Sequence, residues 1–223
     1  MLVVPCVVLL EPQQMEMPQK HVGVIDWHRD EQARLLIARA DEFASNISKG
    51  SSSSSTSSWN ISSLCYHMSR SINSQYLKQV ERSIYLVRCA ARWIFNNVQY
   101  DREGEENGDY SANVSRVVCA NNSIQNRKTG RKGFSILLHV LLEKMDIPTV
   151  IIAGWMDDVT PSEGGTTQKS GATTHSWNAV CIDSYWYLVD LFGAVWKSRS
   201  LDAISPYFMS RPEEFVLDHY PEQ

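Results

Sequence analysis

The stretch that decides the fold runs from residue 174 to residue 190 and reads THSWNAVCIDSYWYLVD. Apolar and polar side chains alternate over 175–182 and again over 185–191, and the pair Asp183-Ser184 separates the two runs. Two alternating runs joined by two turn-forming residues are typical of an antiparallel hairpin. His175 and Asp190 can then lie side by side, where the carboxylate would hold the imidazole in one tautomer and stabilise its charged form. We therefore predict a base and an orienting carboxylate at this pair.

Helical patterns precede this hairpin. Apolar residues recur at helical spacing over 31–47, 80–94 and, most regularly, 129–145. Pro148 ends the last of these patterns, and the β-branched residues of 149–155 predict a strand. Helices first and an antiparallel sheet afterwards indicate an α+β fold, in which the central helix at 130–145 packs against the sheet.

Three parts are expected along the chain. Residues 1–25 contain three prolines and predict an extended lead-in, whereas 26–75 predict a helix plus a flexible serine-rich insertion at 50–58. Residues 76–221 are expected to form the main domain, with the acidic, glycine-containing stretch 102–109 as a loop. The 223 residues, 43% of them apolar, suffice for one sizeable core.

Charge and composition exclude several classes of partner. A net charge of −4 leaves no basic field to attract nucleic acid, and the apolar runs fall short of the ~20 residues that span a membrane. The five cysteines are scattered without a C-x-x-C pair, which favours reduced thiols in the cytoplasm over disulfides or a zinc site. The sequence has no phosphate-binding loop, no dinucleotide fingerprint and no metal-binding pattern among its histidines, so we expect no cofactor and no metal.

Several short motifs occur in a fixed order over about residues 76–221. They are RWIFNNVQYD at 92–101, SIQNRK at 123–128, a helix and the start of a strand at 137–148, HSWNAV at 175–180, WYLVD at 186–190, and RPEEF at 211–215 followed by HYP at 219–221. This set resembles the transglutaminase-like, papain-related superfamily, and most closely its kyphoscoliosis-peptidase-like branch of cytoskeletal proteins. The resemblance implies a transglutaminase-like or papain-like core and a catalytic triad of Cys, His and Asp in active members.

The resemblance places the nucleophilic Cys at the start of the central helix, where the helix dipole and a neighbouring imidazolium favour a thiolate. Aligned without a gap over 137–147, the family's G-x-C-x-G-Y-A pattern falls on TGRKGFS at 129–135 and puts Arg131 at the nucleophile's position. Arginine cannot attack a carbonyl carbon, and a cation is mildly unfavourable at a helix N-terminus. His175 and Asp190 match the rest of the triad. A second departure follows Asp190, where DLFGA replaces the family's D-x-T-W-G turn.

Two other residues are candidates for a nucleophile. Cys119 precedes Arg131 in the chain, but the sequence around it does not predict a buried helix with the thiol at its tip. Ser135 lies one turn beyond Arg131 on the same helix face, but it matches a small buried residue of the family, and serine needs a stronger base than a thiol does.

The remaining candidates have structural or binding interpretations. Three tryptophans are expected to pack in the core, with Trp177 also a candidate binding residue; they are Trp93, Trp177 and Trp186. A basic cluster is expected on a solvated face, or at the mouth of a cleft that receives an acidic segment of a partner. Its members are Arg127, Lys128, Arg131 and Lys132.

These observations favour a catalytically inactive transglutaminase-like domain that acts as a protein-interaction module in a cytoskeletal or scaffold context, by analogy with the branch it resembles. The alternative is an active acyl-transfer enzyme, a peptidase or a transglutaminase, in which Cys119 or Ser135 attacks and His175 is the base. A third hypothesis is an incomplete gene product, because the sequence stops just after the segment at 211–221, where the branch continues.

Overall fold

The computed structural model describes residues 30–50, 59–72, 78–110, 113–156, 173–198, 200–202, 205–210 and 212–222. Its helices are α1 (Glu31–Gly50), α2 (Ile61–Arg70), α3 (Gln79–Asn97), α4 (Arg102–Glu106), α5 (Arg116–Asn126), α6 (Arg131–Lys144), α7 (Leu191–Gly193), the π-helical turn η2 (Ala194–Ser198) and α8 (Pro212–Phe215). Its strands are β1 (Gln99–Tyr100), β2 (Lys128–Thr129), β3 (Thr149–Met156), β4 (Thr173–Ile182), β5 (Tyr185–Val189), β6 (Phe208–Ser210) and β7 (His219–Pro221).

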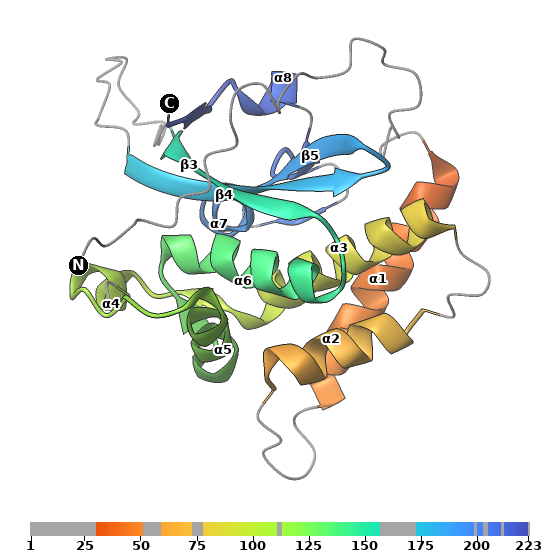
Figure 1. The fold of residues 1–223 in the computed structure, drawn as a ribbon, viewed down its shortest axis with the longest axis horizontal. Coiled ribbons are helices and arrows are strands. Elements are labelled where there is room, and N and C mark those ends of the chain that lie inside the picture. The colour runs from red at the N-terminus through yellow and green to blue at the C-terminus, as the bar shows by residue number, and fades with distance from the viewer. Residues whose placement is uncertain are drawn as a thin grey trace, which may run out of the picture.

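The main sheet has five antiparallel strands in the order β6-β5-β4-β3-β7. Figure 1 shows α6 running along one face of this sheet, with α1, α2, α3 and α5 farther out on the same side and α8 on the opposite side. The strand pair β1 and β2 is separate and parallel, and it joins the end of α3 to the start of α6. The predicted α+β fold with a central helix on an antiparallel sheet is confirmed.

The hairpin of β4 and β5 turns at Asp183 and Ser184, as the alternation predicts. Both residues adopt positive φ angles, 52° and 67°, which is the backbone of a type I′ turn. The register pairs Asn178 with Val189, so Asp190 follows directly at the end of β5 beside the first half of β4. The turn thus fixes which residues of the two strands meet.

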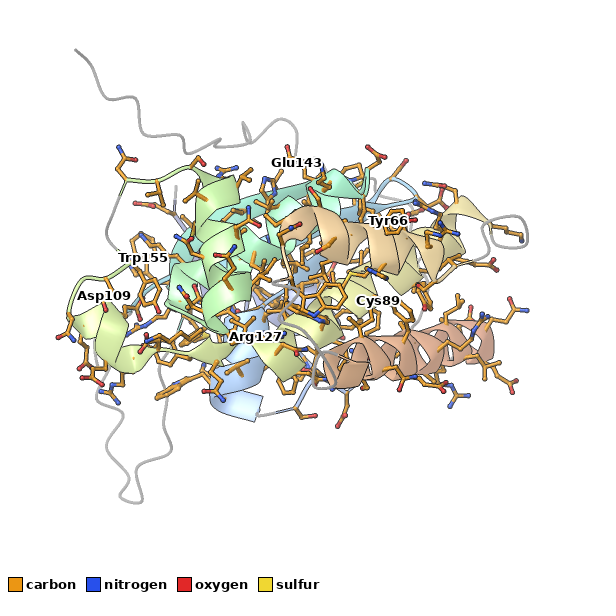
Figure 2. All side chains as sticks on the ribbon, turned by 90° about the horizontal axis from the view of Figure 1, so that it is seen from below. Tyr66, Cys89, Asp109, Arg127, Glu143 and Trp155 are labelled. Atoms are coloured by element: carbon orange, nitrogen blue, oxygen red, sulfur yellow. The ribbon has the colours of Figure 1, made fainter. Side chains whose placement is uncertain are left out.

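One hydrophobic core joins the helices to the sheet. Phe134, Leu137 and Leu141 of α6 are fully or almost fully buried between the sheet and α3. Helices α1 and α2 contribute to the same core through Ala40, Leu64 and other side chains, and Figure 2 shows α1 lying along α3 near Cys89. The core therefore includes residues on both sides of the predicted boundary at 75/76. The lead-in at 1–25 and the serine run at 51–58 lie outside the described residues.

Three helices differ from the sequence-based expectation. The stretch 102–109 is not simply a loop, because α4 occupies its first half and the Asp101 carboxylate accepts a hydrogen bond from the Gly104 N–H at the helix start. Helix α2 is rich in serine but has a capping box between Asn60 and Ser63. Helix α5, which the sequence analysis did not predict, begins with the Ser115 cap and contains Cys119 at its fourth residue.

The described cysteines, Cys65, Cys89, Cys119 and Cys181, are all free thiols. Among the described residues, no helix is both long enough and apolar enough to span a membrane.

Candidate functional site

Arg131 is the first residue of α6, where the resemblance places a nucleophile. Its side chain turns to α4 and β1 instead of projecting as a free cation. The Arg131 Nε donates to Glu105 Oε2 at 3.0 Å and to the Tyr100 hydroxyl at 3.3 Å, and its backbone N–H donates to Glu105 Oε1 at 3.2 Å. The Glu105 carboxylate therefore pairs with the guanidinium and also satisfies a free amide at the helix N-terminus.

Arg131, Glu105 and Tyr100 form a cluster in which the positive and the negative side chain contact each other directly. Tyr100 donates its hydroxyl to Glu105 Oε2 at 2.8 Å. Burial alone would lower the pKa of Arg131, but the hydrogen bond to Tyr100 and the charge of Glu105 raise it. The position thus holds a permanent cation with a bound carboxylate, which is the reverse of a helix end that stabilises a thiolate.

The backbone at the start of α6 packs closely against neighbouring side chains at two glycines. A Cβ atom on Gly133 would overlap the Thr129 side chain, and one on Gly130 would lie only 3.0 Å from the Tyr110 ring. Thr129 is fully buried and its hydroxyl accepts from or donates to Ser123 Oγ at 3.0 Å. These contacts involve glycines of the TGRKGFS motif and fix the helix start independently of the side chain at position 131.

The predicted pair is present. His175 Nε2 lies 2.8 Å from Asp190 Oδ2, and both side chains are at most 1% exposed. Asp190 caps α7, because its Oδ1 accepts the Gly193 N–H at 2.9 Å. The hairpin brings His175 and Asp190 together, and the short helix orients the carboxylate.

The protonation pattern of His175 follows from this contact. Since Asp190 is an acceptor, Nε2 carries the proton, and Nδ1 carries the lone pair. This Nδ1 is buried and has no hydrogen-bond partner. The aromatic ring of Phe192 lies 5.4 Å from the imidazole and also 5.9 Å from the Arg131 guanidinium carbon. His175 is therefore a base whose free nitrogen has no proton donor.

Sequence reasoning missed a second histidine at the site. His219, on the edge strand β7, has Nε2 3.1 Å from the same Asp190 Oδ2 and Nδ1 2.6 Å from Asp218 Oδ1. The register of β7 on β3 pairs His219 with Met156 and so carries the ring under the end of β4. The motif HYP at 219–221 was the available signal, but it identifies a segment and not a contact.

The charges around Asp190 act on its pKa in opposite directions. Burial alone would raise the pKa of Asp190, but the neighbouring His175 and the hydrogen bonds from His175 and His219 hold it far below its ordinary value. For His219, burial alone would lower the pKa, but the hydrogen bonds to Asp190 and Asp218 outweigh burial and raise it. Asp190 is therefore an anion between two imidazole rings.

The ligand atoms of His175, Asp190 and His219 lie within 4.8 Å of one another, which is close enough for a shared metal ion. The sequence had indicated no such set. The hydrogen bonds account for the short separations, since both Nε2 atoms approach the same carboxylate oxygen. A metal would need the lone pairs at both Nε2 positions, so the two N–H protons would have to leave first.

Neither alternative nucleophile lies at the His175 ring in the described structure. Ser135 Oγ contacts Ser176 Oγ at 2.7 Å, and adjacent residues of a strand point to opposite faces, so Ser135 faces away from His175. Cys119 is on α5, which packs mainly against α6 and α2. Burial raises the pKa of the Cys119 thiol, the opposite of what a thiolate nucleophile needs.

Most of the basic cluster is paired internally. Lys128 Nζ lies 2.7 Å from Asp101 Oδ2, and Arg127 donates to Asn97 Oδ1 at 2.7 Å while its guanidinium lies over the Trp93 ring. Figure 2 shows Arg127 between α5 and α3. Lys132 is exposed on the first turn of α6.

The tryptophans and the DLFGA turn at 190–194 place several aromatic rings around His175 and Tyr100. Trp93 and Trp177 are buried and Trp186 is half-buried, in line with the core-packing prediction for the first two. Trp177 contacts the rings of His175, His219 and Phe215. In the DLFGA turn, Phe192 stacks on Trp196 with an interplanar angle of 9° and meets Tyr100 edge-on. Phe192 and Trp196 were not identified from the sequence.

Comparison with known proteins gives consistent relationships. Kyphoscoliosis peptidase of Mus musculus is 25% identical to this chain over 158 residues, which is 67% of this chain and 22% of that protein. Kyphoscoliosis peptidase of Homo sapiens is 24% identical over 158 residues, again 67% of this chain and 22% of that protein. The chain thus spans less than a quarter of these relatives. Among solved structures, a putative cysteine protease from Cytophaga hutchinsonii is 18% identical with a TM-score of 0.40, covering 59% of this chain and 36% of that one. A TGase is 13% identical with a TM-score of 0.38, covering 59% and 31%.

The family model described as the transglutaminase-like superfamily matches residues 70–191, which is more than half of the chain and includes Arg131, His175 and Asp190. With this match, the chain belongs to the transglutaminase-like superfamily.

Proposed function

We propose that this domain is catalytically inactive and serves as a protein-interaction module in a cytoplasmic setting, within a cytoskeletal or scaffold assembly. One observation carries the proposal: Arg131 stands at the nucleophile's position and is held by Glu105, while His175 and Asp190 remain paired. An acyl-transfer reaction needs a nucleophile within hydrogen-bond reach of its base. The His175 Nδ1 has no such partner among the described residues.

The interaction role and its setting are supported by relationship alone. The relatives include kyphoscoliosis peptidase, and the motifs of this chain resemble that cytoskeletal branch. A fold kept intact around an altered nucleophile position is consistent with selection for a surface rather than for a reaction.

The inactivity is tested with two assays on the full chain: peptide hydrolysis, and incorporation of a primary amine into a glutamine-containing protein. The matched control is His175→Gln, which keeps an N–H donor for Asp190 but removes the base. We expect the two proteins to give the same background rate. Turnover that is lost in His175→Gln would overturn the proposal, and a thiol alkylator would then separate attack by Cys119, which it blocks, from attack by Ser135, which it spares.

The binding role is tested at the exposed Lys132 beside the altered site. Proteins cross-linked to the wild type in a cell extract are compared with those cross-linked to Lys132→Gln. The control is Lys144→Gln, which removes the same charge from the far end of α6. We expect a partner that depends on Lys132 and not on Lys144. Identical recovery with all three proteins would exclude binding at the mouth of the site.

A further inference from the structure

The His219 ring has a carboxylate at each of its two nitrogens. Nε2 lies 3.1 Å from Asp190 Oδ2, and Nδ1 lies 2.6 Å from Asp218 Oδ1. The His219 side chain is only 1% exposed, and Asp190 is fully buried, whereas Asp218 is partly exposed. A neutral imidazole has one N–H and one lone pair, and a neutral His219 would direct that lone pair at a carboxylate. Both contacts are hydrogen bonds only if the ring is the doubly protonated imidazolium.

We propose that His219 is a buried imidazolium clamp, which fastens the C-terminal segment 212–222 to Asp190 and thereby gives the retained His175–Asp190 pair a structural task. The clamp requires no reaction and no partner. It therefore stands independently of the proposed binding function.

The charges that face the ring support this assignment. Asp190 and Asp218 are carboxylates, and Lys197 Nζ lies 3.5 Å from Asp218 Oδ2. His175 donates its Nε2–H to Asp190, and its Nδ1 has no hydrogen-bond partner in the described part of the chain. Tyr207, whose ring also packs near His219, stays neutral, since burial and the charges of Asp218 and Asp190 raise its pKa to about 12. A protonated His219 places one cation between two anions, the buried Asp190 and the partly exposed Asp218, and Lys197 adds a second cation beside Asp218.

Aromatic faces complete the binding of the cation. Phe215 of α8 stacks its face on the His219 ring at 3.7 Å between centroids. Trp177 of β4 packs against the ring in a T-shaped contact at 5.1 Å, which adds packing and is not counted as a cation–face contact. A cation above an aromatic face is stabilised by the ring's quadrupole. The stacking also links α8, β7 and the sheet through a single side chain.

The segment is also attached to the sheet by the contact of the buried Phe215 with Trp177 and by a short strand ladder. Strand β7 pairs with β3 over three residue pairs, and Glu222 N–H donates to Ala153 O just beyond them. A three-residue edge strand is weakly held by its ladder alone. The pair of ionic hydrogen bonds at His219 is therefore expected to decide whether the segment stays in place.

The first experiment observes the rings directly in the wild-type chain. Two-bond proton–nitrogen NMR correlations, which report the protonation of each imidazole nitrogen, are recorded from pH 6 to pH 10. At neutral pH we expect His219 to show two protonated nitrogens. A bare nitrogen on His219 at neutral pH would overturn the proposal, and no variant is needed for this test.

The second experiment measures what the clamp holds. Asp218→Asn removes one of the two carboxylates, and Glu213→Gln removes a charge from the exposed face of α8 in the same segment. We expect amide hydrogen exchange over 212–222 to rise by about tenfold or more in Asp218→Asn, the loss corresponding to one charge-assisted hydrogen bond, and to stay at the wild-type rate in Glu213→Gln. Exchange over α3 serves as the internal reference. Equal exchange in Asp218→Asn and the wild type would show that the ring does not hold the segment.

Discussion

Arg131 shows how the charge of one side chain sets the electrostatics at the start of a helix. At the first residue of a helix a cation faces the positive end of the helix dipole, an unfavourable arrangement of about 0.3–1 kcal/mol at exposed sites. Glu105 offsets this by binding both the guanidinium and the backbone N–H of Arg131. The guanidinium at the start of α6 therefore depends on a partner residue on α4, and the two side chains form one ion pair.

Reversal of the substitution tests whether the rest of the site is intact. In Arg131→Cys, the free Nδ1 of His175 and the helix N-terminus both favour a thiolate, whereas Glu105, left without its partner, raises the thiol pKa. We expect the introduced thiol to be alkylated faster in Arg131→Cys/Glu105→Gln than in Arg131→Cys, by about tenfold near neutral pH. Rates are followed by peptide mass spectrometry, which separates this thiol from the native cysteines.

The control for that experiment is His175→Gln in the same double variant. Removal of the base should slow alkylation and shift its pH dependence to that of an ordinary thiol. If His175→Gln changes nothing, the His175 ring does not reach the start of α6, and the altered site differs from its family by more than the side chain at position 131.

At the scale of elements, an ionic cluster joins α1 to α3. Asp41 of α1 accepts hydrogen bonds from Arg88 and Arg92 of α3, and both arginines also donate to the Leu201 carbonyl. Arg88 is fully buried and its Nη1 has no partner, so burial lowers its pKa despite the nearby carboxylate. The attachment of α1 therefore depends on a charge that water cannot replace.

Asp41→Asn should be strongly destabilising for this reason. It removes the carboxylate that is hydrogen-bonded to a buried guanidinium, and we expect the free energy of unfolding to fall by about 2–3 kcal/mol, less than for a fully buried pair because Asp41 is 29% exposed. Urea unfolding measures the loss. Glu42→Gln, an exposed neighbour on the same helix, should change stability by less than about 0.5 kcal/mol. A loss of the same size in both variants would mean that any change of charge on α1 lowers stability, and that the ion pair of Asp41 has no special role.

The hairpin turn offers a stabilising change. Ser184 has φ of 67°, a left-handed conformation that costs a residue with a Cβ about 1–2 kcal/mol relative to the right-handed one. Ser184→Gly should raise the free energy of unfolding by about 0.5–1 kcal/mol, because glycine adopts this angle without strain. Ser184→Ala serves as the control in urea unfolding and should give no gain. An equal gain from alanine would show that the serine hydroxyl, and not the backbone, limits the turn.

The elements that could be predicted are those whose signal is local. Helix α6 and the hairpin follow from apolar spacing, whereas the placing of Arg131 at the nucleophile's position rests on aligning one motif and stays a prediction. The features that the sequence analysis did not predict depend on contacts between residues far apart in the chain. Glu105 lies 26 residues from Arg131, on a helix that Asp101 caps within an acidic stretch, and His219 reaches Asp190 across 29 residues through an edge strand of three. Periodicity carries no information about such pairs.

At the scale of the whole molecule, the domain is larger than its family match. The match begins at residue 70, whereas Ala33, Ala40, Leu64 and Met68, which precede it, are buried in the common core. Helices α1 and α2 are thus part of the folding unit described here, and their loss would expose one side of α3.

The buried cluster at the sheet edge sets the pH range of stability. The pKa values of Asp190 and Asp218 are lowered from 3.8 in the folded chain, so their contribution is present above that value and is lost as pH falls through the folded values. The pKa of His219 is raised from 6.5, so its contribution is complete below 6.5 and is lost as pH rises through the folded value. We expect urea unfolding to give highest stability between these limits and a decline on both sides. Asp218→Asn should weaken the alkaline decline, and an unchanged alkaline decline in that variant would assign it to other groups.

The contact between Trp177 and His219 makes this cluster optically observable. A protonated imidazole quenches the emission of an indole it touches, and Trp177 meets the His219 ring at 5.1 Å in a buried, fixed orientation. Comparison with Trp177→Phe isolates this one emitter from the six other tryptophans. An increase in the Trp177 emission would then report, in real time and at low concentration, that His219 has lost its proton or that the C-terminal segment has separated from the sheet.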